Sequence, residues 1–475
     1  MTWLRIEGMK HAILFMALSI GPADDKAGNV QDIPLGPLGG WVRVRDGESD
    51  AEVTVVKPES PAARAGLLVG DRVFAADGED FPKHTKNISA GGAGPEEELG
   101  DAIERAESGE DGGLTLGVRR GEEELELAVR IPHLGAHTPN FPVGCVKSRS
   151  FQDGICAQLV ASQQADGRWR ATTGISADRY TTALCGIALL GRGDPDHLDA
   201  LGRAAKFLAR PDGTAFLNEE LAPHGGGLDN WAICVTAMYL SEYVIATGDE
   251  SYLPSVQRCA DALVKRMTEG GRFGHAGNVG YGGKGLNIIN TQAQLAWALA
   301  ERAGCEINQE AWEKSLNEIR LSTGENGGVR YWTLQTGYSD ASARTASAAL
   351  ALFVRGEEPE LQARMAGWLS KNSTRLREAH AVGSIGMIYG TCALRCIDEK
   401  AWRGHMDGWA WYLNLMRQPD LTADYLGSKR NNGGDSYLRK RHIAAAICGA
   451  MLSTGDAKLA MCGGKERGWL SPNED

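Results

Sequence analysis

The stretch Thr181–Gly191 reads TTALCGIALLG, and the stretch Ser251–Glu269 reads SYLPSVQRCADALVKRMTE. The first is small and apolar on every side, so a helix made of it must be buried on all sides. The second has apolar residues at helical spacing with charged residues between them, as expected of a helix with one face in water. These two kinds of segment alternate after residue 150, and that alternation decides the fold.

Six segments of each kind follow one another along the chain. The apolar segments begin near Ala177, Leu228, Leu286, Ser339, Gly383 and Asp435, and the amphipathic segments begin near Phe151, His197, Ser251, Asn308, Pro359 and Ala401. Their spacing of roughly 45–60 residues is typical of a helical-hairpin repeat. We therefore predict an all-α (α/α)6 toroid of six helical hairpins over residues 151–460, with the apolar helices inside.

Residues 33–132 have a different pattern, that of a small α+β domain. Alternating apolar residues predict strands at Trp41–Arg45, Glu52–Val56, Leu114–Arg119 and Glu124–Ile131, and helical spacing predicts one helix at Glu96–Ala106. Between the second strand and the rest lies Ser60–Asp71, which reads SPAARAGLLVGD. With this stretch the region resembles a PDZ domain. The proline-containing segment 133–150 has little periodicity and is interpreted as a linker.

The PDZ resemblance implies a peptide-binding role. Such domains add a peptide as an extra strand beside their second strand, and a glycine loop holds the terminal carboxylate of the peptide on backbone N–H groups. The matching loop is Leu38-Gly39-Gly40-Trp41, in which Gly39 stands where the family usually has an apolar residue. The implied partner is the C-terminus of a peptide or protein. A PDZ fold that only packs on its neighbour is the alternative.

Charge and chain ends limit the possible functions. The net charge of −11 argues against a nucleic-acid partner, because phosphate binding requires a basic face. No apolar run reaches the roughly 18 residues that a membrane span needs. The apolar run Ala12–Ile20 follows Lys10 and precedes Ala23, which predicts a signal peptide over residues 1–23 and a secreted or periplasmic protein. Residues 461–475 are interpreted as a C-terminal tail.

The ten cysteines are mostly interpreted as buried thiols. Five of them lie in the apolar helical stretches: Cys185, Cys234, Cys392, Cys396 and Cys448. A free cysteine behaves as a small apolar residue in such a position. Cys392 and Cys396 are one helical turn apart and could share a metal, but no second pair has zinc spacing. Neither a metal nor another cofactor is predicted.

The loops of the predicted ring are unequal in length, and this is the best indication of a functional site. Connections from an apolar helix to the next amphipathic helix are short, whereas those in the other direction are long, such as Pro211–Gly227 and Gln418–Gly434. In an alternating ring all the long loops emerge on one rim, where the inner helices begin. Long loops are uncommon unless they have a function, so we predict one pocket at this rim.

The rim carries charged and aromatic side chains. An aspartate at a helix start is first of all a cap and a partner of the helix dipole, but charges on buried helices are costly unless they are paired or face a wet cavity. The predicted proton-transfer residues are Asp229, Asp340, His442 and His224. The predicted ligand-binding residues are Asp178, Trp169, Tyr281, Trp332, Tyr338, Arg344, Asp435 and Arg439. Helix N-termini that point inward favour an acidic ligand.

Over residues 151–460 the predicted ring resembles the α/α toroid of terpenoid cyclases and protein prenyltransferases. Gln164–Trp169 (QADGRW) is similar to the Q-x-G-x-W element by which such cyclases brace outer helices to loops, and Gly327–Trp332 (GGVRYW) is a looser echo of it. The catalytic signatures are absent, since the chain has neither a D-x-D-D nor a D-D-x-x-D motif. The resemblance therefore implies the fold rather than the chemistry.

Three functions remain open. The same toroid serves glycoside hydrolases and polysaccharide lyases, so the first is an exported protein that binds, and as a hydrolase or lyase cleaves, an acidic extracellular glycan. The second is a non-catalytic interaction module in which toroid and PDZ domain both bind partners. The third is a terpenoid cyclase-like or prenyltransferase-like protein. A carboxylate pair roughly 5–10 Å apart across the pocket would favour hydrolysis. Whether the protein is an enzyme stays open.

Overall fold

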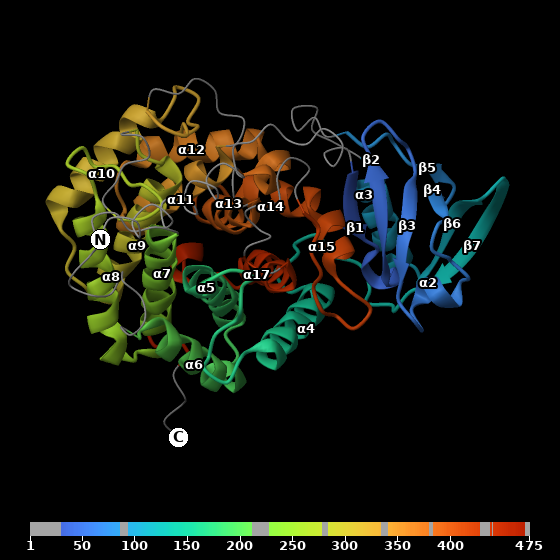
Figure 1. The fold of residues 1–475 in the computed structure, drawn as a ribbon, viewed down its shortest axis with the longest axis horizontal. Coiled ribbons are helices and arrows are strands. Elements are labelled where there is room, and N and C mark those ends of the chain that lie inside the picture. Colours follow the sequence, from blue (N-terminus) through green and yellow to red (C-terminus); the bar gives the residue numbers. More distant parts are fainter. Residues whose placement is uncertain are drawn as a thin grey trace, which may run out of the picture.

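The computed structural model describes residues 30–85, 94–210, 228–277, 284–333, 341–379, 383–427, 438 and 440–470. The sheet of an N-terminal domain lies at one side of a larger ring of helices (Figure 1). None of the helices in these ranges is both long and apolar enough to cross a membrane.

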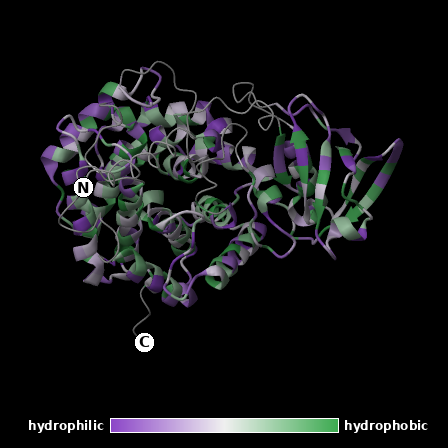
Figure 2. Cartoon of the chain, in the orientation of Figure 1, coloured by the Kyte–Doolittle hydropathy of each residue, from purple (hydrophilic) through white to green (hydrophobic). Residues whose placement is uncertain are grey.

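Within the described ranges, six inner helices form the ring. They are α5 (Ile175–Arg192), α7 (Asp229–Thr247), α9 (Asn287–Ala303), α11 (Ser342–Arg355), α13 (Gly383–Ile397) and α17 (Lys440–Ser453). Each contacts the helix before it and the helix after it, and α17 returns to α5, so the ring is closed. Their residues are almost all buried and predominantly apolar. Figure 2 colours the same helices by hydropathy. The prediction that the apolar segments form the inner layer is confirmed.

An outer layer of amphipathic helices covers the ring. It consists of α4 (Val146–Ser162), α6 (Leu198–Leu208), α8 (Leu253–Arg266), α10 (Gln309–Ser322), α12 (Pro359–Lys371), α14 (Glu399–Gly408) and α15 (Ala410–Met416). These helices pack against their inner neighbours along the chain, and α4 also packs against α17. Each turns its apolar stripe inward, as α6 does with Leu201, Ala205 and Leu208. The predicted (α/α)6 toroid is confirmed.

A repeated tight turn joins the outer helices to one another. It recurs in residues 164–168, 268–272, 324–328 and 418–422, where the first N–H donates to the fifth carbonyl oxygen. The fourth residue, which is Gly167, Gly271, Gly327 or Leu421, has a positive φ and lies against the backbone of another outer helix. A side chain at Gly327 would collide with the carbonyl of Arg364 on α12. These turns brace the outer layer, and Leu421 closes it against Gly154 of α4.

The N-terminal domain is an antiparallel sheet with one long helix. Its strands are β1 (Val30–Pro34), β2 (Gly40–Arg45), β3 (Ala51–Val56), β4 (Arg72–Ala76), β5 (Glu79–Asp80), β6 (Gly113–Arg120) and β7 (Glu123–Arg130), in the order β1-β2-β3-β4-β6-β7 with β5 beside β4. The helices are α2 (Pro61–Arg64) and α3 (Pro95–Ser108), and a short 3-10 turn, η1 (Gly36–Leu38), joins β1 to β2. The four predicted strands and the predicted helix are present. The strands β1, β4 and β5 were not predicted.

The N-terminal domain packs closely on the toroid through α15. This helix lies against α3, β1 and η1 (Figure 1). The approach is close enough to require glycine twice, because a side chain at Gly100 would collide with Trp411 and one at Gly36 with the carbonyl oxygen of Asn414. The face that α15 covers is therefore fixed in shape.

Residues 461–470 pack on the toroid. Residues 461–475 were predicted to be a C-terminal tail, but Met461, Cys462 and Leu470 are buried. The backbone N–H groups of residues 468 and 470 donate to Ile245 and Ala246, at the C-terminal end of α7, at 2.8 Å each. The buried side chains of Met461, Cys462 and Leu470 fill the end of the ring, although most of the residues between 462 and 470 are glycine or charged. We call residues 459–470 the C-terminal plug.

Candidate functional site

The first turns of α5 and α7 meet at the rim where the inner helices begin, which we call the mouth. Asp229 is the first residue of α7, and its side chain is half-buried. Its Oδ1 accepts a hydrogen bond of 2.7 Å from Oγ of Ser176, in the first turn of α5. No side chain caps α7, whose N-cap residue is Leu228. The Asp229 carboxylate thus links two inner helices at the mouth instead of forming a local cap.

An aromatic cluster follows directly in the sequence. Trp231 donates from Nε1 to Nδ1 of His275 at 3.0 Å, and the two rings stack with centroids 6.1 Å apart. Tyr180 of α5 meets Trp231 edge-on at 6.0 Å. Because Nδ1 of His275 accepts a hydrogen bond, that ring carries its proton on Nε2 while the bond holds. An indole, a phenol and a neutral imidazole therefore lie beside the Asp229 turn.

Asn230 holds this arrangement together. Its amide donates to the carbonyls of Gly274 at 2.9 Å and Gly277 at 3.1 Å, which fixes the loop that carries His275. Its Oδ1 accepts from Nη1 of Arg266 at 3.2 Å. Burial lowers the pKa of Arg266, and the negative charge of Asp229 opposes that effect. A buried cation thus lies under the mouth and is coupled to the Asp229 carboxylate.

The ring axis is closed by a polar contact among three alternate inner helices. Oε1 of Gln292 on α9 accepts from the hydroxyls of Tyr180 at 3.2 Å and Tyr389 at 3.1 Å. All three side chains are buried, and burial raises the pKa of Tyr389 well above its ordinary value. Paired polar groups of this kind favour one arrangement of the helices around them. The contact separates the mouth from the plugged end of the ring.

Two predicted ligand-binding residues brace the fold instead. Trp169 is fully buried, and its Nε1 donates to the carbonyl of Leu159 at 2.8 Å. Asp178 is buried too, and its oxygens accept from the backbone N–H of Ala171 at 2.7 Å and from Nη1 of Arg168 at 2.9 Å. Both side chains therefore hold the turn after α4 against the first inner helix, α5.

Three further predicted residues have mixed placements. Arg344 is buried, its Nε donates to the carbonyl of Val329 at 3.1 Å, and its guanidinium lies over the ring of Tyr331 at 5.3 Å. It therefore holds a loop rather than facing outward. His442 is largely buried, with Nδ1 3.1 Å from the carbonyl oxygen of Arg170. Trp332 is half-buried, and the ammonium of the exposed Lys284 lies 4.9 Å from its ring centre.

The remaining predicted site residues lie outside the described residues. They are His224, Tyr281, Tyr338, Asp340, Asp435 and Arg439. The pocket that was predicted from them stays a prediction. Among the residues that the structure does describe, no three His, Cys, Asp or Glu side chains could hold a metal ion together.

Sequence reasoning did not assign Trp231, Tyr180 or Asn230 to the site. Each lies in an inner helix whose other residues are small and apolar, so a large aromatic there reads as core. A signal was present in the stretch Asp229–Trp231, where a carboxylate, an amide and an indole open one buried helix. Three side chains able to form hydrogen bonds are unusual at such a position.

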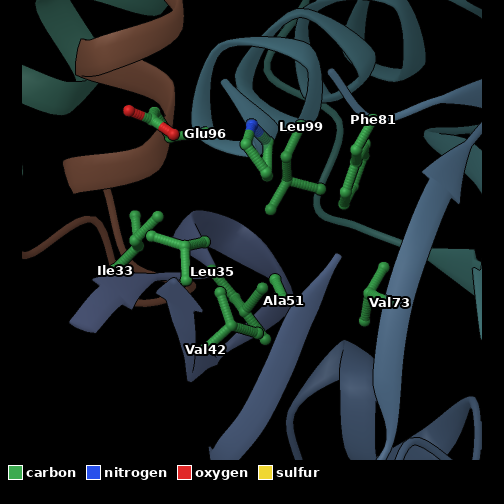
Figure 3. A pocket seen from close by; sticks show the side chains of 10 residues that line it. Ile33, Leu35, Val42, Ala51, Val73, Phe81, Glu96 and Leu99 are labelled. Atoms are coloured by element: carbon green, nitrogen blue, oxygen red, sulfur yellow. The ribbon is translucent and has the colours of Figure 1, made fainter. Parts of the chain in front are cut away.

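The peptide groove of the N-terminal domain is already filled by its own chain. Strand β1 pairs antiparallel with β2, from Val30 opposite Arg45 to Pro34 opposite Trp41, and β3 pairs with the other edge of β2. Within the described residues, β2 has no open edge. Figure 3 shows the side chains of Ile33 on β1 and of the neighbouring Leu35, which line a small apolar pocket between this sheet and α3. A peptide could pair beside β2 only after β1 had left.

The loop that was predicted to bind a peptide carboxylate is also occupied by contacts within the protein. Leu38, Gly39 and Gly40 are buried, and only Trp41 is half-buried. The N–H groups of Leu38 and Gly39 donate to the carbonyls of residues 35 and 36 within the turn itself. The side chain of Pro419 from the toroid lies against Gly39. The loop therefore presents no free cradle for a carboxylate in this conformation.

Buried ion pairs fasten this domain to the toroid. Oε2 of Glu107 lies 2.6 Å from Nη2 of Arg417 and 2.7 Å from Nζ of Lys147. Glu104 pairs with Lys147 as well and accepts from Nδ2 of Asn414 at 2.9 Å. Burial alone would raise the pKa of Glu104, but its hydrogen-bonded and charged neighbours hold that pKa well below its ordinary value. Charges buried in this way persist only when they are paired.

A PDZ domain docked on an (α/α)6 toroid is the class of protein that this fold defines. The family described as "PDZ domain" matches residues 52–99. The family described as "Domain of unknown function (DUF6288)" matches residues 154–463. That match spans more than half of the chain, so the protein belongs to the DUF6288 family.

Solved structures share the ring at low sequence identity. The type II terpene cyclase MstE from Scytonema is 14% identical, with 65% of this chain and 98% of that chain covered and a TM-score of 0.44. A variant α-1,6-mannanase of Salegentibacter is 10% identical, with 64% and 99% covered and a TM-score of 0.47. The cellobiose 2-epimerase from Spirochaeta thermophila is 12% identical, with 64% and 97% covered and a TM-score of 0.43. These likenesses concern the fold alone. No curated protein matches the chain.

Proposed function

We propose that this protein binds an acidic glycan chain at the mouth of the toroid and acts on it by acid–base chemistry through Asp229. The observation that carries the proposal is the first turn of α7. There a half-buried carboxylate, held by Ser176 from the neighbouring helix, lies two residues before Trp231, whose indole is 4% exposed. A carboxylate beside aromatic faces suits a sugar ring, because the carboxylate serves hydroxyl groups or protons and the aromatic rings cover apolar faces.

Positive charge around the mouth supports an acidic ligand. Arg266 lies buried under the Asp229 turn, and Lys284 is exposed beside Trp332. The inner helices also turn their N-termini toward this rim, and helix N-termini attract anions. These groups give the mouth a local basic character in a chain whose net charge is −11. Export, which the run Ala12–Ile20 predicts, would bring the protein to such chains.

The remaining proposed residues complete the site. His442 at the start of α17 and His275 beside Trp231 supply imidazoles for proton transfer. His224, Tyr281, Tyr338, Asp340, Asp435 and Arg439 are proposed from the sequence alone to line the same mouth. A second carboxylate from Asp340 would make the chemistry hydrolytic, whereas an imidazole without a second carboxylate would suit a lyase.

The test is to incubate the full chain with a panel of soluble polyuronates and sulfated glycans. Hydrolysis would be measured as new reducing ends, and elimination as the ultraviolet absorbance of unsaturated products. Titration calorimetry on the same panel would detect binding. Either product, with saturable binding, is the expected result. Binding without any product would reduce the proposal to a lectin-like role. Neither binding nor product would overturn it.

We further propose that the PDZ domain takes a C-terminal peptide only when β1 leaves β2. The paired edges of β2 and the buried turn Gly36–Gly39 support this. A chain that begins at residue 36 should then bind C-terminal peptides more tightly than the full chain in a fluorescence polarisation assay. Circular dichroism would establish that both chains are folded. Equal affinity of the two folded chains would contradict the proposal.

A further inference from the structure

The C-terminal plug closes the end of the ring opposite to the mouth. Within it a short 3-10 turn, η6 (Ala460–Cys462), lies against α13. The buried carboxylate of Glu242 on α7 accepts the backbone N–H groups of Ala460 at 2.9 Å and Met461 at 2.7 Å. At the end of α9, Nη2 of Arg302 donates to the carbonyl of Gly464 at 2.5 Å. The plug is thus held by specific polar groups of two inner helices.

A pair of thiols joins the plug to a third inner helix. Sγ of Cys392 on α13 lies 3.1 Å from Sγ of Cys462, the last residue of η6. Both side chains are buried, at 1% and 2% exposure. All ten cysteines lie in the described ranges and are free thiols there, and this is the one pair for which a sulfur–sulfur contact is found in them.

We propose that Cys392 and Cys462 form a disulfide that ties the C-terminal plug to α13 under oxidising conditions. A thiolate of one cysteine attacks a low-molecular-weight disulfide oxidant and releases one thiol. The second cysteine then displaces the other thiol from the mixed disulfide. The two cysteines lose two protons and two electrons in total, and the oxidant leaves as two thiols. The new bond closes a loop that contains α14, α15 and α17.

The environment of the pair sets when oxidation can occur. The hydrogen bond with Cys462 and burial raise the pKa of Cys392 well above its ordinary value. The thiolate is the reactive species, so the closed plug protects the reduced pair. Oxidation therefore takes place while the plug is open, during folding or after local opening. Once formed, the bond is shielded from reductants in the same way.

Cys396 is the natural competitor, which makes it the matched control. It lies one turn further along α13, and its Sγ donates to the carbonyl of Met461 at 3.5 Å. Burial raises the pKa of Cys396 too. Its sulfur faces the backbone of the plug rather than the thiol of Cys462, so we expect it to remain reduced.

The experiment is to unfold the full chain in denaturant and refold it in a mixture of reduced and oxidised glutathione, or in excess reductant. The products are then alkylated under denaturing conditions and examined by intact mass and peptide mapping. The oxidised sample should carry two fewer alkylated thiols and a peptide that links Cys392 to Cys462. The Cys396→Ser variant should keep this link, and both Cys392→Ser and Cys462→Ser should lose it.

The outcomes decide the proposal. Ten alkylated thiols after oxidative refolding, or a link made through Cys396 or any other residue, would overturn it. Where refolding yields are poor, the same alkylation can be applied to chain produced in an oxidising compartment. There too the unlinked peptides would overturn the proposal and the linked peptide would support it. Oxidised chain should also unfold at a higher temperature than the same chain with reductant.

Discussion

The guanidinium of Arg417, just after α15, donates from Nη2 to Oε2 of Glu107 on α3 at 2.6 Å, with both side chains buried. This bond joins the toroid to the PDZ domain at the face where β1 fills the peptide groove. Since Lys147 meets the same carboxylate oxygen, the contact forms a network rather than an isolated pair. The network therefore links the stability of the toroid to that of the PDZ domain.

Arg417→Gln should destabilise the protein by about 1–3 kcal/mol, because the buried Glu107 carboxylate loses one of its two charged partners and keeps Lys147. Urea unfolding of the full chain measures this. The control is Lys314→Gln, which removes an exposed ion pair with Glu310 and should leave the unfolding midpoint unchanged. Equal midpoints for the two variants would show that the docking contact is not formed.

Ile33→Ala should cost about 2–4 kcal/mol, because this β1 side chain is 1% exposed in the groove between the sheet and α3. Val55→Ala is the matched control, since Val55 on β3 is 44% exposed. Thermal unfolding of both variants gives the comparison. If Ile33→Ala lowered the unfolding temperature no more than the control does, β1 would not fill the groove in solution.

The contribution of Glu242 to stability should fall as the pH rises from about 5 to 8. Burial raises the pKa of this carboxyl to about 7 in the folded protein, from 4.5 as its ordinary value. A raised folded pKa contributes stability that is complete below the unfolded pKa and lost as the pH rises through the folded pKa. The shift corresponds to about 3 kcal/mol.

Glu242→Gln supplies the reference for that measurement. The amide cannot ionise, so the difference in unfolding free energy between the two proteins isolates the titration of Glu242. This difference should change steeply between about pH 5 and 8. A difference that is constant over the range would mean that Glu242 titrates alike in the folded and unfolded chains.

Gly327→Ala should destabilise the protein by about 1–3 kcal/mol or more, since φ is +89° and the added carbon would collide with the Arg364 carbonyl. Gly367→Ala, three residues further along α12 from Arg364, meets nothing within 4 Å and should be neutral or stabilising by up to about 1 kcal/mol. Denaturant unfolding compares them. Similar effects at both sites would contradict the bracing role of the turn.

The ring could be predicted from the sequence because helices that are apolar all round have few alternatives to a fully buried layer. Strand β1 could not, because VQDIP is short, mixed in polarity and ended by proline, and only its position beside β2 makes it a strand. The burial of the C-terminal plug could not be predicted from the sequence for a related reason. Its apolar residues Leu459, Met461 and Leu470 are widely spaced, and no local periodicity reports their burial.

The sequence predicts where the inner helices begin, but not which partners the side chains there have. At the rim where the inner helices begin, Asp229 contacts Ser176 of the preceding inner helix. A residue type alone does not tell which way its side chain turns. Asp178 and Asp229 lie in the first turns of successive inner helices. The carboxylate of Asp178 accepts hydrogen bonds from the turn after α4, whereas that of Asp229 does not. Such differences arise because the length and path of each loop decide which groups lie within hydrogen-bond distance of these side chains.

We propose that the Asp229 carboxylate acts on a ligand at the mouth. Asp229→Asn should keep the unfolding free energy within about 1 kcal/mol, whereas Asp178→Asn should lose stability, because two hydrogen bonds that anchor the turn after α4 depend on its charge. The decisive measurement is the turnover of acidic glycan by these two variants and the unchanged chain at equal folded concentration. We expect turnover to fall by at least about 100-fold in Asp229→Asn and to be retained in folded Asp178→Asn. Full turnover by Asp229→Asn would show that this carboxylate does not act on the ligand.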